Sequence, residues 1–177
     1  MSSVKSPALT PADLYAVLQT ALVEVSENAF FVFVERCDAG QFAALAEQMP
    51  AHGAGPAGQS RAWLKSSVAY VGAFSGSVEI ALPERLGASL VASLLGMSPD
   101  EELAESQTFD GVGEFTNMVC GACLSRLGDT ALFELRVPAV TRMALEWNPL
   151  TEAPGRAELV CLMVSLNDLP MRVRVLA

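Results

Sequence analysis

Histidine is nearly absent from this chain, and its scarcity excludes several common kinds of active site. The single histidine, His52, stands alone in a glycine-rich stretch, so a Ser-His-Asp or Cys-His catalytic set and a histidine-ligated zinc site lack the residues they require. The sequence also contains no Walker-type loop and no Gly-x-Gly-x-x-Gly motif after a predicted strand, so nothing supports nucleotide binding. We expect no metal ion and no cofactor bound by this protein itself.

Basic residues are also few. The chain has 11 Lys and Arg against 20 Asp and Glu, a formal net charge of −9 at pH 7. Nucleic acids and anionic membrane surfaces attract clusters of Lys and Arg, so neither is an expected partner. No apolar run reaches the roughly 18 residues that a membrane span needs. Acidic residues interrupt residues 1–30, which argues against a secretory signal, and the sequence predicts a cytoplasmic protein.

Cysteine is present but in a pattern that gives little support for redox or metal chemistry. In a reducing compartment Cys37, Cys120, Cys123 and Cys161 should be thiols. Cys120 and Cys123 have CxxC spacing, but they fall in the middle of a helix-length segment, whereas a reactive CxxC normally opens a helix. We interpret both as small core residues. A thiol-based sensor is therefore the weakest functional hypothesis.

The remaining pattern predicts an α+β fold with an antiparallel sheet. Apolar residues at helical spacing predict helices, and short apolar or alternating runs predict strands. Helices are expected at 10–28, 42–49 and 83–95, and a helical stretch starting at Ser98 is expected to lead into a long helix that ends at 127. Strands are expected at 67–74, 77–82, 131–137, 143–147, 158–166 and 171–176, while residues 30–34 fit either the first helix or a strand. Strands followed by helices and strands, with short connections, are typical of α+β proteins.

The length of 177 residues and an apolar content of 51% favour one domain with a sizeable core. We expect this domain to span residues 1–177. Residues 1–9 should form a flexible start. Residues 50–60, rich in glycine and proline, should form a flexible loop.

The main candidate for chemistry is a polar stripe on the predicted long helix. At roughly 100° per residue, Asp110, Glu114, Asn117 and Gly121 fall within an arc of about 60°. A carboxamide can donate to and accept from one water molecule, and a carboxylate can pair with a lysine. The outer face of any amphipathic helix shows similar spacing. Gly121 is, however, unexpected inside a helix, because Gly destabilises a helix by roughly 1 kcal/mol relative to Ala. Its presence favours a patch without side chains where another protein can approach the backbone.

The series Asp110-x3-Glu114-x2-Asn117-x3-Gly121, followed by a strand ending at Pro138, closely resembles the motif of the CheC/CheX/FliY phosphatases of bacterial chemotaxis. Residues 113–121 look most like the CheX branch. The resemblance covers residues 68–140 well, whereas residues 1–60 match only as an N-terminal helix. It implies a CheC/CheX-like α+β fold, in which long helices pack on one face of an antiparallel sheet.

The resemblance also implies a function: hydrolysis of the phosphoaspartate of a CheY-like response-regulator receiver domain. The receiver would bring the acyl phosphate, a bound Mg²⁺ ion and a lysine. Asn117 would orient the attacking water, and Glu114 would contact the lysine. Asp110 and Gly121 would help to dock the partner, although Asp110 suits the start of a helix equally well.

Three further expectations follow from the family. Two-site relatives carry a second Glu-x-x-Asn on the first helix, but here Glu24 is followed by Glu27 where Asn is needed, and Asn28 comes one residue late. One active centre per chain is therefore expected. CheX-type proteins pair through sheet edges, which implies a homodimer. The alternative function is a non-catalytic, CheC-like module that binds a receiver or another signalling protein through the same helix.

Overall fold

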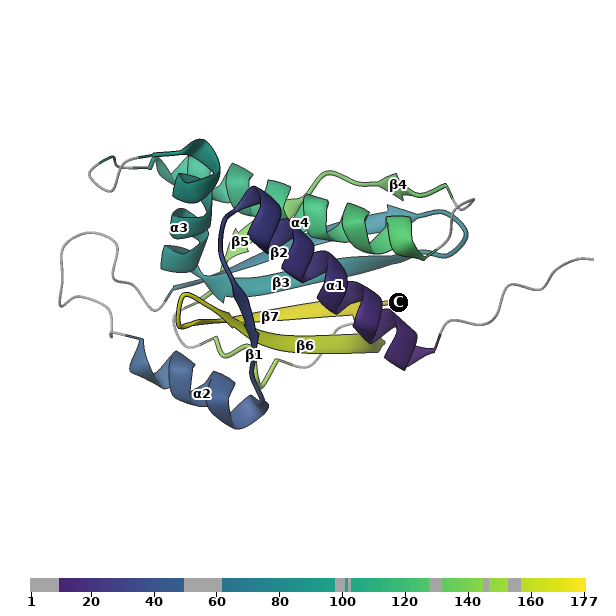
Figure 1. The fold of residues 1–177 in the computed structure, drawn as a ribbon, viewed down its shortest axis with the longest axis horizontal. Helices are drawn as coiled ribbons and strands as arrows, with labels where there is room; N and C mark the ends of the chain where they lie inside the picture. The colour runs from purple at the N-terminus through teal and green to yellow at the C-terminus, as the bar shows by residue number, and fades with distance from the viewer. Residues whose placement is uncertain are drawn as a thin grey trace, which may run out of the picture.

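The computed structural model describes residues 10–49, 62–97, 101, 103–127, 132–144, 147–152 and 157–177. The expected flexible regions at 1–9 and 50–60 lie outside these residues. Within them the chain forms four helices and a seven-stranded sheet (Figure 1). Every strand pairing is antiparallel, so the predicted α+β class is confirmed.

The helices are α1 (Pro11–Ala29), α2 (Ala39–Gln48), α3 (Glu84–Leu95) and α4 (Glu105–Arg126). The strands are β1 (Val34–Arg36), β2 (Trp63–Val71), β3 (Gly76–Pro83), β4 (Glu134–Leu135), β5 (Ala139–Arg142), β6 (Glu158–Leu166) and β7 (Leu169–Leu176). The strand order is β1-β6-β7-β3-β2-β4, and β5 pairs with another part of β2.

Local sequence signals set several of these boundaries. The Thr10 hydroxyl accepts a hydrogen bond from the Asp13 N–H, and the Asp13 carboxylate accepts one from the Thr10 N–H, which closes a capping box at the start of α1. Gly96 ends α3 with a φ of 63°, a left-handed conformation that costs glycine little. Asn167 and Asp168 have φ values of 49° and 59° and form the predicted turn between β6 and β7.

Three predictions of secondary structure are wrong. Glu101, Leu103 and Ala104 are not helical; α4 begins only at Glu105, where the Gln107 side chain accepts a hydrogen bond from the Ala104 N–H and caps the helix. The strand expected at 131–137 is reduced to the two residues of β4, and β5 begins after Pro138, a residue with no N–H to donate to a sheet.

The third concerns the strand expected at 143–147, whose described residues Met143, Ala144 and Trp147 are not in a strand. The Met143 N–H still donates to the Trp63 carbonyl oxygen at 2.8 Å, and the side chains of Met143 and Trp147 pack into the apolar cluster around Trp63. Residues 31–33, whose sequence fits either a helix or a strand, are irregular and lead into the edge strand β1.

The main core lies between the sheet and the three helices α1, α3 and α4. Figure 1 shows α1 and α4 side by side across one face of the sheet, with α3 at one end. Phe30, just after α1, packs edge-on against Phe115 of α4 with 4.9 Å between ring centroids. Long helices on one face were predicted, and this is confirmed. The largest buried side chains of this core are Phe30, Phe115, Leu18, Leu22, Leu64, Ile80, Leu82, Leu86, Leu90, Leu162 and Leu166.

The other face of the sheet carries α2 and a smaller cluster built from Phe42, Met49, Trp63 and Ala81. Trp63 directly precedes the core residue Leu64 in β2, and Ala81 lies between core residues in β3. Neighbouring residues of a strand face opposite sides of the sheet, so Trp63 and Ala81 face away from the main core. The short α2 therefore covers the face that the long helices leave open.

A group of charged side chains lies on this second face. Arg172 and Arg174 of β7 are almost fully buried, with side-chain exposures of 5% and 3%. The Glu152 carboxylate accepts hydrogen bonds from Lys65 Nζ at 2.8 Å, Arg172 Nη2 at 2.6 Å and Arg174 Nη2 at 2.9 Å. Arg174 also pairs with Glu79 at 2.7 Å. One carboxylate thus joins the segment 147–152 to three cations of the sheet.

We predict that Glu152→Ala lowers the free energy of unfolding by about 3 kcal/mol, because it leaves the buried Arg172 guanidinium without its carboxylate and takes one of the carboxylates of Arg174. Glu134→Ala is the matched control, since its pair with Arg136 is largely exposed and should contribute less than about 1 kcal/mol. Chemical denaturation at pH 7 measures both. Equal losses in the two variants would contradict the role assigned to Glu152.

The same group should affect acid stability. Burial alone would raise the pKa of Glu152, but hydrogen bonds from Lys65 and Arg172 outweigh it, so the pKa is lowered from its ordinary value of 4.5. A lowered folded-state pKa gives stability that is present above pH 4.5 and is lost as the pH falls through the folded pKa. The decline of stability below this pH should be shallower in Glu152→Gln than in the wild type.

Candidate functional site

The stripe predicted from the sequence lies on α4, which spans 22 residues. One side of this helix is core: Val112, Phe115 and Val119 are buried. Thr116 is buried as well, and its hydroxyl donates to the Val112 carbonyl oxygen at 2.9 Å, so the helix itself satisfies this polar group. The packing of this side fixes which residues of α4 face outward.

The outward side carries the four predicted site residues. Asp110 and Glu114 are exposed, and Asn117 and Gly121 are half-buried. Asn117 Nδ2 lies 3.5 Å from Glu114 Oε2, at the limit of a hydrogen bond. Within the described part of the chain this is the one hydrogen bond of the Asn117 side chain. The Glu114 carboxylate and the Asn117 carboxamide therefore lie together on the outer side of a helix whose other side is buried. Their polar atoms are accessible to a partner.

Gly121 lies beside a shallow hollow next to the stripe. Gly121, Leu124 and Ser125 of α4 line it together with Phe133 and Leu135 from the segment around β4, and its volume is about 190 Å³. A Cβ atom on Gly121 would lie 3.8 Å from Leu135 Cδ1, which is an ordinary contact. Packing inside the chain therefore does not require glycine at this position.

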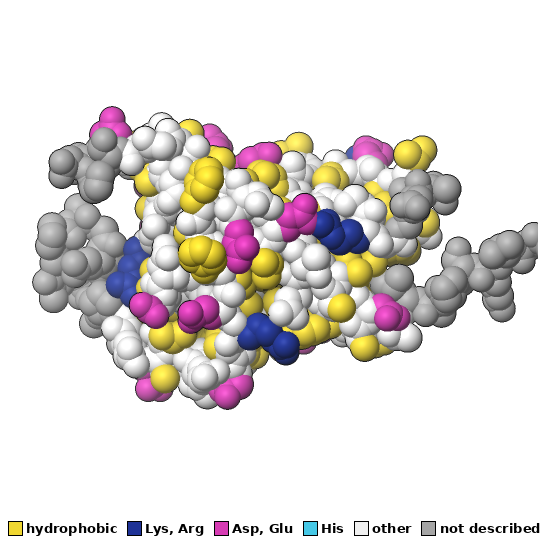
Figure 2. All heavy atoms as spheres, viewed as in Figure 1, with side chains coloured by type: hydrophobic (Ala, Val, Ile, Leu, Met, Phe, Trp, Pro, Cys, Tyr) yellow, Lys and Arg dark blue, Asp and Glu magenta, His cyan; other side chains and the backbone are white. Residues whose placement is uncertain are grey.

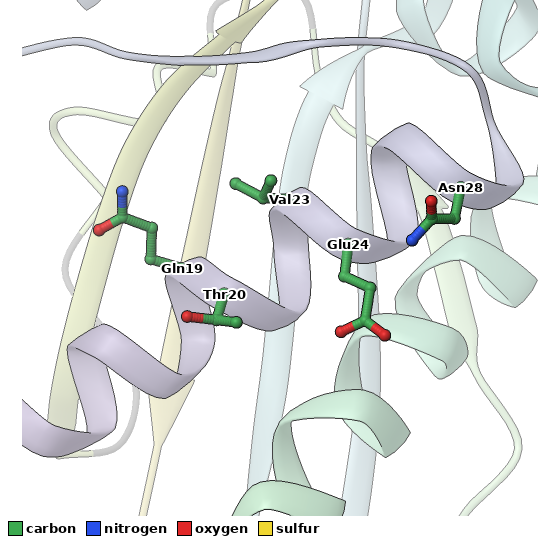
Figure 3. Close-up of a pocket in the computed structure, with 5 residues that line it drawn as sticks. All are labelled: Gln19, Thr20, Val23, Glu24 and Asn28. Carbon is green, nitrogen blue, oxygen red and sulfur yellow. The ribbon is translucent and has the colours of Figure 1, made fainter.

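Glu24 of α1 is engaged in the structure of the chain itself. It pairs with Arg126, in the last turn of α4, and Figure 3 shows its carboxylate turned toward that helix. Glu24 and Asn28 also line a surface hollow of about 320 Å³ on α1. The spacing is one residue longer than in the motif on α4, and the acid already has a cationic partner. This arrangement supports the expectation of one active centre per chain.

The two central cysteines are unsuited to thiol chemistry. Cys120 and Cys123 are 0% and 2% exposed. Burial raises the pKa of Cys120 to about 12 and that of Cys123 to about 11. Both side chains are therefore neutral thiols near pH 7, whereas the nucleophile in thiol chemistry is the thiolate. Their interpretation as core residues is confirmed by this burial.

The described residues contain no group of three or more His, Cys, Asp or Glu side chains that could hold a metal ion. None of the described helices has the length and apolar character that crossing a membrane requires. On the helical face, acidic side chains are spread among apolar ones, with few basic side chains between them (Figure 2). This surface suits a partner that presents cations.

The structure adds one residue to the site that the sequence did not indicate. Arg142, at the end of β5, contacts the first turns of both α3 and α4. Its partner Glu84 is 58 residues away along the chain, so no local pattern could have revealed the contact.

Comparison with known proteins gives a consistent result. Residues 65–148 match the family model described as chemotaxis phosphatase CheX. No curated protein matches the sequence.

Several solved structures share the fold. CheX from Vibrio vulnificus has 18% identity and a TM-score of 0.66, over 94% of this chain and 97% of that chain. CheX from Desulfovibrio desulfuricans has 16% identity and a TM-score of 0.63, over 92% and 97%. A CheX-CheY-BeF3-Mg²⁺ complex from Borrelia burgdorferi has 15% identity and a TM-score of 0.58, over 93% and 97%.

At these identities the structures establish the fold alone, and the family model adds the match in sequence. That match covers both proposed chemical residues, Glu114 and Asn117, and the β5 strand that follows them. The resemblance to the CheC/CheX/FliY family is thereby confirmed: residues 65–148 match the CheX family model, and the fold is that of the CheX structures.

Proposed function

We propose that this protein hydrolyses the phosphoaspartate of a CheY-like receiver domain. The observation that carries the proposal is the outward-facing pair of Glu114 and Asn117, whose Oε2 and Nδ2 atoms lie 3.5 Å apart on one face of α4. Two findings support it: the matching family is described as a chemotaxis phosphatase, and one structure with the same fold is a complex of CheX with CheY, BeF3 and Mg²⁺. The receiver would dock over the stripe on α4.

In this proposal the chain contributes geometry and the receiver contributes charge. The Asn117 carboxamide holds a water molecule in line with the phosphorus atom. As the water oxygen bonds to phosphorus, the bond between phosphorus and the aspartyl oxygen breaks, which releases inorganic phosphate and the receiver carboxylate. Positioning of this kind removes much of the entropic part of the barrier. The receiver's Mg²⁺ and lysine stabilise the negative charge on the phosphoryl group.

Glu114 is assigned to the receiver's lysine on electrostatic grounds. A carboxylate next to a phosphoryl group is repelled unless a cation lies between them. Among the described residues no Lys or Arg forms an ion pair with Glu114, and the neighbouring turns of α4 carry Asp110 and Asn117. A lysine from the partner would satisfy the Glu114 carboxylate and set the register of the two proteins.

We also propose that two copies of the chain pair through sheet edges and that the protein works in the cytoplasm, where phosphorylated receivers are found. The strand β1 has three residues and lies at one edge of the sheet. Phe31 and Phe33, just before it, are 74% and 77% exposed. Exposed aromatic side chains beside an open sheet edge are suited to association.

Asn117→Ala should lower kcat for receiver dephosphorylation by at least about a hundredfold, because the attacking water loses its orienting group. The decay of a receiver loaded with a small phosphodonor gives the rate, and calorimetry with a BeF3-treated receiver gives the affinity, which should change little. Gln48→Ala, an exposed residue of α2 on the other face of the sheet, is the control. Full activity in Asn117→Ala would remove this residue from the mechanism. Wild-type binding without any acceleration would favour the non-catalytic module.

Glu114→Gln keeps the shape of the side chain and removes its charge. We expect KM to rise about tenfold, which is the loss of about 1.4 kcal/mol expected for one charge-assisted contact. The effect should shrink as the salt concentration increases, since screening weakens the same contact in the wild type. Asp110→Asn serves as comparison and should have a smaller effect. An unchanged KM in Glu114→Gln would rule out the contact with the receiver's lysine.

Gly121→Ala should separate stability from docking. The added methyl group has room beside Leu135, and Ala is favoured over Gly in a helix by up to about 1 kcal/mol, so thermal stability should rise. KM should rise as well, because the methyl group occupies the bare patch used by the receiver. Gly111→Ala is the contrasting variant: its methyl group would overlap the Val91 side chain and should destabilise the fold. Higher stability with unchanged KM in Gly121→Ala would argue against docking at this position.

A further inference from the structure

Arg142 makes several contacts at the N-terminal end of α4, the helix proposed to dock the receiver. Its Nε donates to Glu84 Oε2 at 3.1 Å, and its Nη2 donates to the other oxygen of the same carboxylate. Its Nη1 lies 2.9 Å from Glu105 Oε1. The guanidinium carbon also lies 5.5 Å from the centre of the Phe109 ring. Each of the three guanidinium nitrogens therefore has an acidic partner, and each of these contacts has a defined direction.

These contacts join three separate elements. Arg142 is the last residue of β5 and pairs in register with Leu64 of β2. Glu84 and Glu105 are the first residues of α3 and α4, and Phe109 lies one turn further along α4. A single side chain thus connects the sheet to the starts of both helices. The hydrogen bond with Glu84 is the main reason why the pKa of Arg142 is raised, so the group keeps its charge throughout the working pH range.

The two helices α3 and α4 also approach closely at glycines: a Cβ atom on Gly87 would lie 2.8 Å from Val112 Cγ2, and one on Gly111 would overlap Val91. This apolar packing sets which side of α4 faces the core. Hydrogen bonds add a restraint with a defined direction. The forked contacts of Arg142 are directional, and they act at the end of α4 that leads into Asp110 and Glu114.

We propose that Arg142 is a positioning residue for the reaction: by tying the first turn of α4 to α3 and to the sheet, it restrains small rotations of this helix about the orientation that core packing sets. This inference rests on the proposed function. Glu114 lies nine residues after Glu105, about 13.5 Å along the helix axis, so a small rotation at the start of α4 carries over to the pair that meets the receiver. A misplacement of about 1 Å can reduce a rate about a hundredfold.

The test compares full-length wild type with Arg142→Ala, Arg142→Lys and Arg136→Ala. Arg136 is the matched control, because it is also an exposed arginine with an acidic partner, but that partner, Glu134, is a neighbour in the segment around β4 and not in a helix. Arg142→Ala should lower kcat about tenfold or more, with KM changed less than about threefold, because orienting a water molecule tolerates less displacement than surface docking. Lys keeps the charge but not the fork, so Arg142→Lys should recover only part of kcat.

Hydrogen–deuterium exchange of residues 109–114 provides a readout that does not depend on activity. Exchange there should be faster in Arg142→Ala than in Arg136→Ala, while the denaturant midpoint changes little, since these ion pairs are largely exposed. If wild type shows no phosphatase activity, the proposed function fails but the exchange result still tests the anchoring of α4. Unchanged exchange, an unchanged kcat, or full recovery by Lys would each overturn the role of Arg142.

Discussion

The burial of one side of α4 is the constraint on which the site depends. Phe115, fully buried and in edge contact with Phe30 at 4.9 Å, and its apolar neighbours hold this side against α1 and the sheet. Because a helix turns by a fixed angle per residue, fixing the buried side also fixes which residues are exposed. Glu114 and Asn117 are then held outward by a backbone that does not have to rearrange when a partner arrives. Such preorganisation reduces the conformational entropy lost on docking.

A site of this kind needs few chemical groups of its own. The proposed reaction takes its metal ion, its cation and its phosphoryl group from the receiver, and this chain adds an amide and a carboxylate. The formal charge of −9 and the scarcity of basic side chains on the helical face (Figure 2) are consistent with that division. The acidic surface can attract a partner that presents Mg²⁺ and lysine, and in the proposed complex the absence of a side chain at Gly121 lets that partner come close.

Sequence reasoning succeeded where the information is local. The capping box of Thr10 and Asp13, the glycine after α3 and the stripe on α4 all depend on residues within a few positions of one another. It failed where distant segments decide the outcome. Residues 143–147 have the composition of a strand, but the side chains of Met143 and Trp147 pack in the cluster around Trp63 on the second face of the sheet. The hollow beside Gly121 and the contacts of Arg142 likewise join residues from separate elements, so no spacing along the chain encodes them.

The two ends of α4 are held by ion pairs with different neighbours, and this bears on the number of active centres. Arg142 holds the start of the helix to α3 and the sheet, while Arg126 holds its end to Glu24 of α1. In two-site relatives the first helix carries its own Glu and Asn pair, as the family resemblance implies. In this chain Glu24, at the position of that acid, forms an ion pair with Arg126 of α4. Asn28 comes one residue later than the motif requires. A second receiver docking on α1 would have to break the pair that holds the end of α4. Use of Glu24 as an anchor and its use as a second catalytic acid therefore exclude one another.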